Sequence, residues 1–293
     1  MASLKEIRGR IASVGNTRKI TGAMKMVSSA KLHRAQDAIF RFLPYWNKIS
    51  GIMDTYLENN IDADLGELTE VRKVNRLAIV VLSSNTGLCG AYNINVQKKL
   101  SEVLASYNSI PAKDITIYFI GKKVYDEFAA KNAGYEITGY FPELSEKPNY
   151  EGLNKLTNEL MASFISKKFD KLELVYNQFK STAIQLPVNE VLLPVTVTVE
   201  ETTAKRTTID YIIEPSPQEL SEVLTPTVVR LQMYRALLNS YASEHGARTT
   251  AMQIATDNAD ELIDDLKLQY NKLRQDAITN ELIDIVGGSE VFR

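Results

Sequence analysis

Cysteine and histidine are scarce in this chain of 293 residues, which limits the chemistry that it can perform. The single cysteine, Cys89, excludes an intramolecular disulfide and any cysteine-rich zinc site. The two histidines, His33 and His245, leave little material for a histidine-based metal site or for acid–base catalysis. The composition therefore indicates a protein with few catalytic groups, and a lone cysteine fits a reducing compartment.

Long apolar runs are also missing. The longest, Leu77–Leu82, has the length of a strand and falls far short of the roughly 18–20 residues that span a bilayer. The N-terminus is rich in lysine and arginine but holds no apolar run, so we expect no secretory signal. A mitochondrial transit peptide is the alternative, but the helical period continues past any cleavable length. With 44% hydrophobic and 24% charged residues, the composition is that of a soluble globular protein.

Proline is absent after Pro226. Between Pro226 and the pair Gly287 and Gly288, the only glycine is Gly246. Apolar residues recur every three or four positions between these points, which predicts a helix over 226–286. About 60 residues at 1.5 Å each make a rod of roughly 90 Å, a length typical of a coiled coil. The glycine pair is expected to end this helix.

Prolines are expected to interrupt the helical segments elsewhere. A helix over 4–42 has an apolar seam that thins to small residues, and Pro44 should end or kink it before the pattern resumes as far as Leu57. Ser216–Glu219 combines an N-cap serine with a following proline and glutamate, which predicts a short helix that restarts at Pro226.

The two ends of the chain carry opposite charge. Residues 1–41 hold nine basic and two acidic side chains, a balance of +7, whereas residues 244–293 hold ten acidic and five basic ones, a balance of −5. Opposite charges attract if the end helices lie side by side; two unrelated solvated faces are the alternative. The simplest arrangement is an antiparallel pair of end helices.

Strands alternate with helices in the middle of the chain, which predicts βαβ units and a mostly parallel sheet. The expected strands are 76–84, 114–121, 135–141 and 171–179, and the expected helices are 91–107, 122–132 and 151–169. From 184 the pattern has strands only and suggests an antiparallel edge of the same sheet. We therefore predict a long antiparallel coiled coil of N- and C-terminal helices with an inserted Rossmann-like α/β domain. Its parts are 1–57 (N-terminal helix), 58–75 (linker), 76–214 (α/β domain) and 215–293 (C-terminal helix).

One loop lies where α/β folds bind phosphates, between a strand and a helix. It reads SSNTGLCGAYN over 83–93 and matches neither GxGxxG nor the Walker pattern, so a structural turn competes with a nucleotide site. Cys89 within it could be a nucleophile or a buried small residue. His33 and His245 lie on the two end helices and could face each other, either as histidines with hydrogen-bond partners between the helices or as part of a metal site that needs further ligands.

The segment 20–32, ITGAMKMVSSAKL, is slim, basic and unusually rich in methionine. A nucleic-acid surface would need aromatic residues among the basic ones, and none lies there. Met24 and Met26 would ordinarily fill a core, but their small and polar neighbours favour a contact surface.

Three motifs together resemble one family, the γ subunits of F-type ATP synthases of the bacterial type. They are ITGAMKMVSSAKL (20–32), SSNTGLCGAYN (83–93) and SEHGARTTAMQIATDNA (243–259), the last leading to YNKLRQDAITNELIDIVGG (270–288). The resemblance covers essentially the whole chain. It implies a rotating central shaft that couples proton flow through a membrane ring to ATP synthesis or hydrolysis elsewhere, without a catalytic, cofactor or metal site of its own.

The resemblance also implies partners and contact residues. The partners are three α and three β subunits, the ε subunit and the ring of c subunits, at the cytoplasmic side of the inner (plasma) membrane as a peripheral component and without nucleic acid. Met24 and Lys25 match the family position that faces an acidic lever segment of β. Arg248, Gln275 and Thr279 match positions that touch the αβ ring and influence coupling.

The loop departs from the family pattern, which usually reads Ser-Asp-Arg-Gly-Leu-Cys-Gly-Gly. Asn85, Thr86 and Ala91 replace three of those residues, which puts charged contacts of this loop to ε or the c ring in doubt. Two other functions are weighed against the rotor: an α/β enzyme with helical arms, which needs a competent pocket, and a passive coiled-coil scaffold.

Overall fold

A computed structural model describes residues 3–59, 66–131, 134–196 and 216–291 of the protein. The chain divides into two compact units, described separately below. The helical unit comprises Met1–Ser29 and Arg248–Arg293, and the sheet unit comprises Ala30–Ala247. Two long helices, α1 (Leu4–Asn59) and α6 (Pro217–Val291), contribute to both units. The division into four segments made from the sequence stays a prediction.

The sheet unit is built on five strands in the order β3-β2-β1-β4-β5. Their bounds are β1 Leu77–Leu82, β2 Ile115–Ile120, β3 Glu136–Tyr140, β4 Lys171–Phe179 and β5 Gln185–Leu193. The first four strands pair in parallel, and β5 is antiparallel to β4. Every residue of central β1 is buried, which accounts for its unbroken apolar sequence. The mostly parallel sheet with an antiparallel edge is confirmed, and the strand expected after residue 206 lies outside the described residues.

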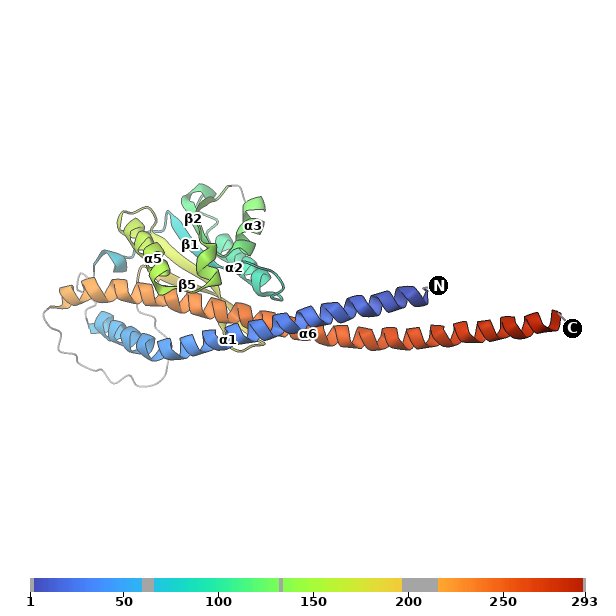
Figure 1. Cartoon of the computed structure of the whole chain (residues 1–293). Coiled ribbons are helices and arrows are strands. Elements are labelled where there is room, and N and C mark those ends of the chain that lie inside the picture. The colour runs from blue at the N-terminus through green and yellow to red at the C-terminus, as the bar shows by residue number, and fades with distance from the viewer. Residues whose placement is uncertain (1–2, 60–65, 132–133, 197–215, 292–293) are drawn as a thin grey trace. The chain divides into compact units, whose positions relative to one another are not determined.

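Helices cover both faces of this sheet (Figure 1). One face packs against α2 (Tyr92–Ser106) and α3 (Lys122–Lys131). The other packs against α5 (Tyr150–Ile165) and against residues of α1 and α6 that belong to the sheet unit. Three short elements were not predicted: η1 (Glu67–Thr69, in the expected linker), η2 (Ala112–Asp114) and α4 (Pro142–Glu146).

Neither proline ends its helix, so the expected helix ends at these two positions are wrong. Pro44 lies inside α1, which continues to Asn59. The turns after it are held by packing, since Met53 is 2% exposed in the core and Trp46 lies against that core, which offsets the hydrogen bond that proline removes. Likewise, α6 is a single helix through Pro226 rather than two.

The glycine pair does not end α6 either, because the helix runs through Gly287 and Gly288 to Val291. Glycine weakens a helix by only about 1 kcal/mol relative to alanine, so it permits a stop without enforcing one. The start of α6 follows the prediction: the backbone N–H of Glu219 donates to Ser216 Oγ at 3.3 Å, and the Ser216 hydroxyl donates to the Glu219 carboxylate at 3.3 Å.

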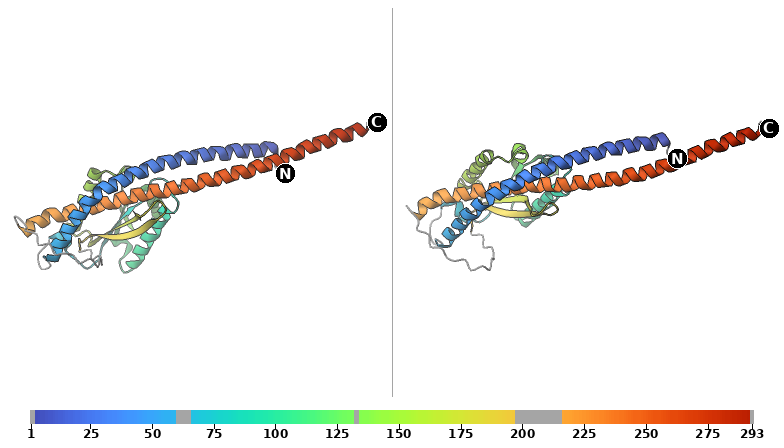
Figure 2. Two further views of the ribbon diagram at one scale, coloured as in Figure 1. Left: turned by 90° about the horizontal axis from the view of Figure 1, so that it is seen from below. Right: turned by 60° about the horizontal axis from the view of Figure 1, so that its bottom comes forward.

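The two long helices are antiparallel within each unit, as predicted. In the helical unit Arg18 contacts Asp260 at 2.8 Å, and Thr21 contacts Thr256 at 2.9 Å, so numbers rise along one helix as they fall along the other. In the sheet unit the rings of Phe42 and Tyr234 meet edge to face with centroids 5.4 Å apart. Both views in Figure 2 show the two helices running in opposite directions.

Candidate functional site

The loop after β1 lies at the carboxyl edge of the parallel sheet, where many α/β proteins bind ligands. The connections from β1 to β2 and from β3 to β4 proceed in opposite directions along the sheet, so β1 and β4 flank the point where the strand order reverses. A phosphate site at this point requires backbone N–H groups that face open space.

Three backbone N–H groups at this edge have partners within the protein. The N–H of Ser84 donates to Asn93 Oδ1 at 3.2 Å, that of Lys122 to Asn85 Oδ1 at 3.1 Å, and that of Lys123 to the Ser84 carbonyl at 2.9 Å. These bonds tie the start of the loop to α2 and to the residues that follow β2, which favours the structural turn over a nucleotide site.

Asn85 is one of the departures from the family pattern, and its side chain links three strand ends. Besides accepting from the N–H of Lys122 after β2, its amide donates to the carbonyl of Pro142 after β3 at 2.8 Å. The residue therefore serves an internal connection that needs a neutral side chain able both to donate and to accept.

Cys89 is a buried small residue, as one of the two interpretations held. It is 2% exposed and packs with Tyr92 and Ala247. The Asn93 amide lies 3.3 Å from its sulfur, and none of these neighbours is a base that could activate a thiol.

The ligand crevice of the fold is filled by the chain itself. Tyr92, the first residue of α2, is 2% exposed, and its hydroxyl lies 2.6 Å from Ser240 Oγ on α6. A helix of the same protein thus occupies the place where a dinucleotide-binding fold would hold its cofactor.

The two histidines do not form the expected pair. His33 has a side chain that is 79% exposed, and it lies 3.9 Å from Asp37 one turn along α1. His245 is buried and meets the Tyr241 ring edge to face at 4.5 Å. Within the described part of the chain, no group of three or more histidine, cysteine, aspartate or glutamate side chains could hold a metal ion.

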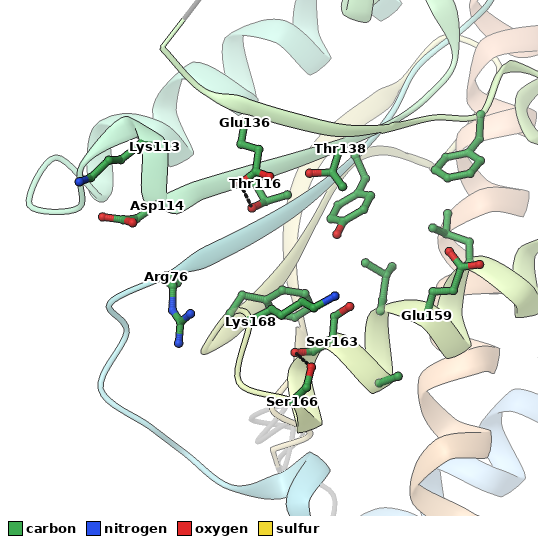
Figure 3. A pocket seen from close by; sticks show the side chains of 16 residues that line it. Arg76, Lys113, Asp114, Thr116, Glu136, Thr138, Glu159, Ser163, Ser166 and Lys168 are labelled. Atoms are coloured by element: carbon green, nitrogen blue, oxygen red, sulfur yellow. Dashed lines mark hydrogen bonds between the residues drawn. The ribbon is translucent and has the colours of Figure 1, made fainter.

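A cavity of about 1060 Å³ lies between the β2–β3 side of the sheet and α5 (Figure 3). No histidine or cysteine is among its lining residues. Glu136 contacts Thr116 at 3.5 Å, while Glu159 projects from α5 on another side of the cavity. Burial, and then the charges of Glu136 and Glu159, raise the pKa of the Tyr118 hydroxyl, so this tyrosine stays protonated and is no base.

The five contact residues implied by the resemblance all belong to the helical unit. Met24 and Lys25 are half-buried on α1, and Arg248 on α6 is 6% exposed. Gln275 and Thr279 are exposed and share one face of α6, where the Thr279 hydroxyl donates to the Gln275 carbonyl at 2.9 Å.

The helix register explains that exposure. Arg18 pairs with Asp260, so the antiparallel register carries Gln275 and Thr279 to or past Leu4, where α1 begins. This end of α6 therefore has no described residue of α1 opposite it.

The protein therefore belongs to a class in which an α/β domain is attached to two long antiparallel helices. Its ligand crevice is filled by the chain itself. A family model described as ATP synthase matches residues 3–291. The ATP synthase gamma chain of Phocaeicola vulgatus is 48% identical, with 99% of each chain covered, and that of Bacteroides thetaiotaomicron is also 48% identical with the same coverage. The chain belongs to the ATP synthase gamma chain family, and the resemblance noted in its motifs is confirmed.

Solved structures share the fold. A chain from the Euglena gracilis mitochondrial ATP synthase has a TM-score of 0.66 at 20% identity, covering 99% of this chain and 94% of that one. A chain from the central stalk and c-ring of the Tetrahymena thermophila enzyme has a TM-score of 0.58 at 20% identity, covering 80% and 99%. Membership of the gamma chain family makes the chain part of the membrane-associated ATP synthase complex. None of its described helices is both long and apolar enough to cross a membrane.

Proposed function

We propose that this chain is the rotating central shaft of a proton-translocating ATP synthase and carries no active site of its own. The observation that carries the proposal is the helical unit, in which two long antiparallel helices meet through small and polar side chains such as Thr21 and Thr256. Small residues in the seam let the two helices lie close together, and a slim rod of this kind suits a role inside a close-fitting ring of partners.

The partners are three α and three β subunits, ε and the ring of c subunits, with the chain peripheral to the cytoplasmic side of the inner membrane. The names of the structural neighbours support this assignment, since one names the central stalk and c-ring and another names F1 and the c-ring. No nucleic acid and no cofactor take part.

The shaft acts by presenting different surfaces to each β subunit in turn. The first 41 residues carry a balance of +7 and the last 50 a balance of −5, so the helix pair is electrostatically asymmetric. Met24 and Lys25 on the basic helix meet an acidic lever segment of β, and Arg248, Gln275 and Thr279 on the other helix touch the ring. As the shaft turns, its contacts favour a different β conformation at each position, which shifts the population of nucleotide-binding states.

Reconstitution with α and β tests the proposal. We expect the three-component complex to hydrolyse ATP and the chain alone to have no activity. Hydrolysis of ATP by the purified chain would support an α/β enzyme instead, and unchanged activity of α and β with or without the chain would support a passive scaffold. Copurification should recover α, β, this chain and ε near 3:3:1:1, the stoichiometry that the family resemblance implies.

A further inference from the structure

Buried polar groups connect the α/β domain to helix α6 within the sheet unit. The Tyr92 hydroxyl and Ser240 Oγ are 2.6 Å apart. The Asn177 amide, from β4, donates to the Tyr92 carbonyl at 3.0 Å, and the Ser243 hydroxyl donates to the Asn177 carbonyl at 2.9 Å. All four residues are at most 4% exposed, and we call them the joint.

Small residues on α6 allow the domain to approach this closely. Ser240, Ser243 and Ala247 follow one another at spacings of three and four, which places them on one face of the helix. Gly246 lies beside them, and a Cβ atom there would lie 3.2 Å from the Phe179 ring. The small residues of this part of the sequence thus form the α6 side of the joint.

A second contact lies about one and a half turns away along α6. Arg235 donates to Glu190 on β5 at 2.7 Å, and Glu190 also accepts from the Tyr176 hydroxyl at 2.8 Å. The Arg235 guanidinium lies 4.7 Å from the centre of the Trp46 ring on α1. The sheet is therefore also held to α6 here, roughly 7 Å from the joint along the helix axis, and again where the Gln232 amide donates to the Val191 carbonyl of β5 at 3.2 Å.

We propose that the joint is the rigid connection through which torque passes between the α/β domain and the two long helices, an inference that rests on the rotor function proposed above. Apolar packing is non-directional and resists sliding weakly, whereas hydrogen bonds fix the relative orientation of the groups they join. Burial makes each of these bonds costly to break, because a lost partner leaves a desolvated hydroxyl or amide. The crevice that binds ligands in related folds serves here as a mechanical attachment.

Cys89 provides a direct measure of whether the joint stays closed. It is the only cysteine in the chain, it is 2% exposed, and it packs against Tyr92 and Ala247. In the complete complex in inverted membrane vesicles, labelling by a thiol reagent is followed on the peptide that contains Cys89. We expect protection to persist during ATP-driven proton pumping.

Tyr92→Phe and Ser240→Ala each remove one hydroxyl and keep the shape of the joint. We expect either variant to raise the labelling rate of Cys89 about tenfold, since a buried hydroxyl without its partner favours opening by that order. The number of protons pumped per ATP hydrolysed should fall when the complex pumps against an opposing proton gradient. The rate of ATP hydrolysis without a gradient should be unchanged. Tyr125→Phe and Ser101→Ala, which lie outside the joint, serve as matched controls and should behave as wild type.

Three outcomes would overturn the proposal: labelling of wild-type Cys89 at the rate of turnover, unchanged labelling in both joint variants, or full pumping by variants that label faster. Each of these outcomes counts only in vesicles in which the wild-type chain supports proton pumping. Failure of the wild-type chain to support pumping would instead contradict the rotor function itself.

Discussion

Thr21 on α1 and Thr256 on α6 meet hydroxyl to hydroxyl at 2.9 Å within the helical unit. Each hydroxyl also lies near a carbonyl of its own helix, Thr21 at 3.0 Å from Arg18 and Thr256 at 2.7 Å from Met252, so one threonine donates across the helices while the other donates within its own helix. A polar contact in a seam of small residues selects one helix register, because any slip would separate the two hydroxyls. The ion pair between Arg18 and Asp260 lies one turn away and agrees with the same register.

The threonine pair should show energetic coupling. We expect Thr21→Val and Thr256→Val each to lower the free energy of unfolding by about 1 kcal/mol, because each leaves the other hydroxyl without its interhelical partner. The double variant should cost less than the sum, since valines of similar shape replace both groups. Thermal unfolding of the four chains measures the cycle. Strict additivity would show that the two hydroxyls do not interact in solution.

Gly121, after β2, should not tolerate a side chain. Its φ is +114°, and a Cβ atom would lie 2.1 Å from the Ser83 carbonyl oxygen. We expect Gly121→Ala to lower stability by roughly 3 kcal/mol or more, because backbone of both strands must move. Gly87→Ala is the control, since the atom nearest to its added Cβ, Lys123 Cε, would be 3.9 Å away. Equal melting temperatures for the two variants would refute the close approach of Gly121 to β1.

Met24→Lys should leave assembly intact but impair coupling. The added charge would hold the acidic segment of β more tightly, and an extra ion pair of about 1 kcal/mol slows release roughly fivefold. ATP-driven proton pumping per ATP hydrolysed in vesicles is the measurement. Met26→Lys is the control, because it adds the same charge about 200° around α1. Unchanged pumping with Met24→Lys would remove Met24 from the coupling surface.

Tyr176 should make stability depend on alkaline pH. Burial, and then the Glu190 carboxylate, raise the pKa of its hydroxyl well above the ordinary value of 10.0, although the Arg235 charge opposes this. A raised folded-state pKa contributes stability below pH 10 that is lost as the pH rises further, since the unfolded chain then releases the proton first. Relative to Tyr176→Phe, the wild type should lose up to about 1.4 kcal/mol per pH unit above pH 10. Denaturant unfolding from pH 8 to 11 tests this, with exposed Tyr45→Phe as the control; parallel curves for wild type and Tyr176→Phe would contradict it.

Local patterns were sufficient for most elements of the fold. The apolar run Leu77–Leu82 matches β1 residue for residue, and the capping box at Ser216 lies at the start of α6. The missed elements are short: α4, for example, spans only Pro142–Glu146. Such elements carry too few residues for a periodic signal, although Pro142 at the first turn is a recognised start signal.

Where local signals failed, tertiary packing outweighed them. Pro44 weakens α1 locally, but the turns that follow bury Met53 and pack Trp46 against the core of the sheet unit. Their places on the two long helices allowed His33 and His245 to face each other, but His33 is exposed beside Asp37 and His245 is buried beside Tyr241. Which residues of two helices meet depends on the register between the helices. The spacing of residues along either helix does not specify that register.

The sequence by itself determined the order of strands and helices, the two long terminal helices and the family, because these depend on periodicity and on contiguous motifs. Only the tertiary structure decided that the ligand crevice is closed and what closes it. Tyr92 and Ser240 are 148 residues apart in the chain, and Asn177 and Ser243 are 66 apart. Neither pair belongs to a common local pattern. They meet because the sheet folds against α6, and packing of that kind brings together residues that no local signal relates.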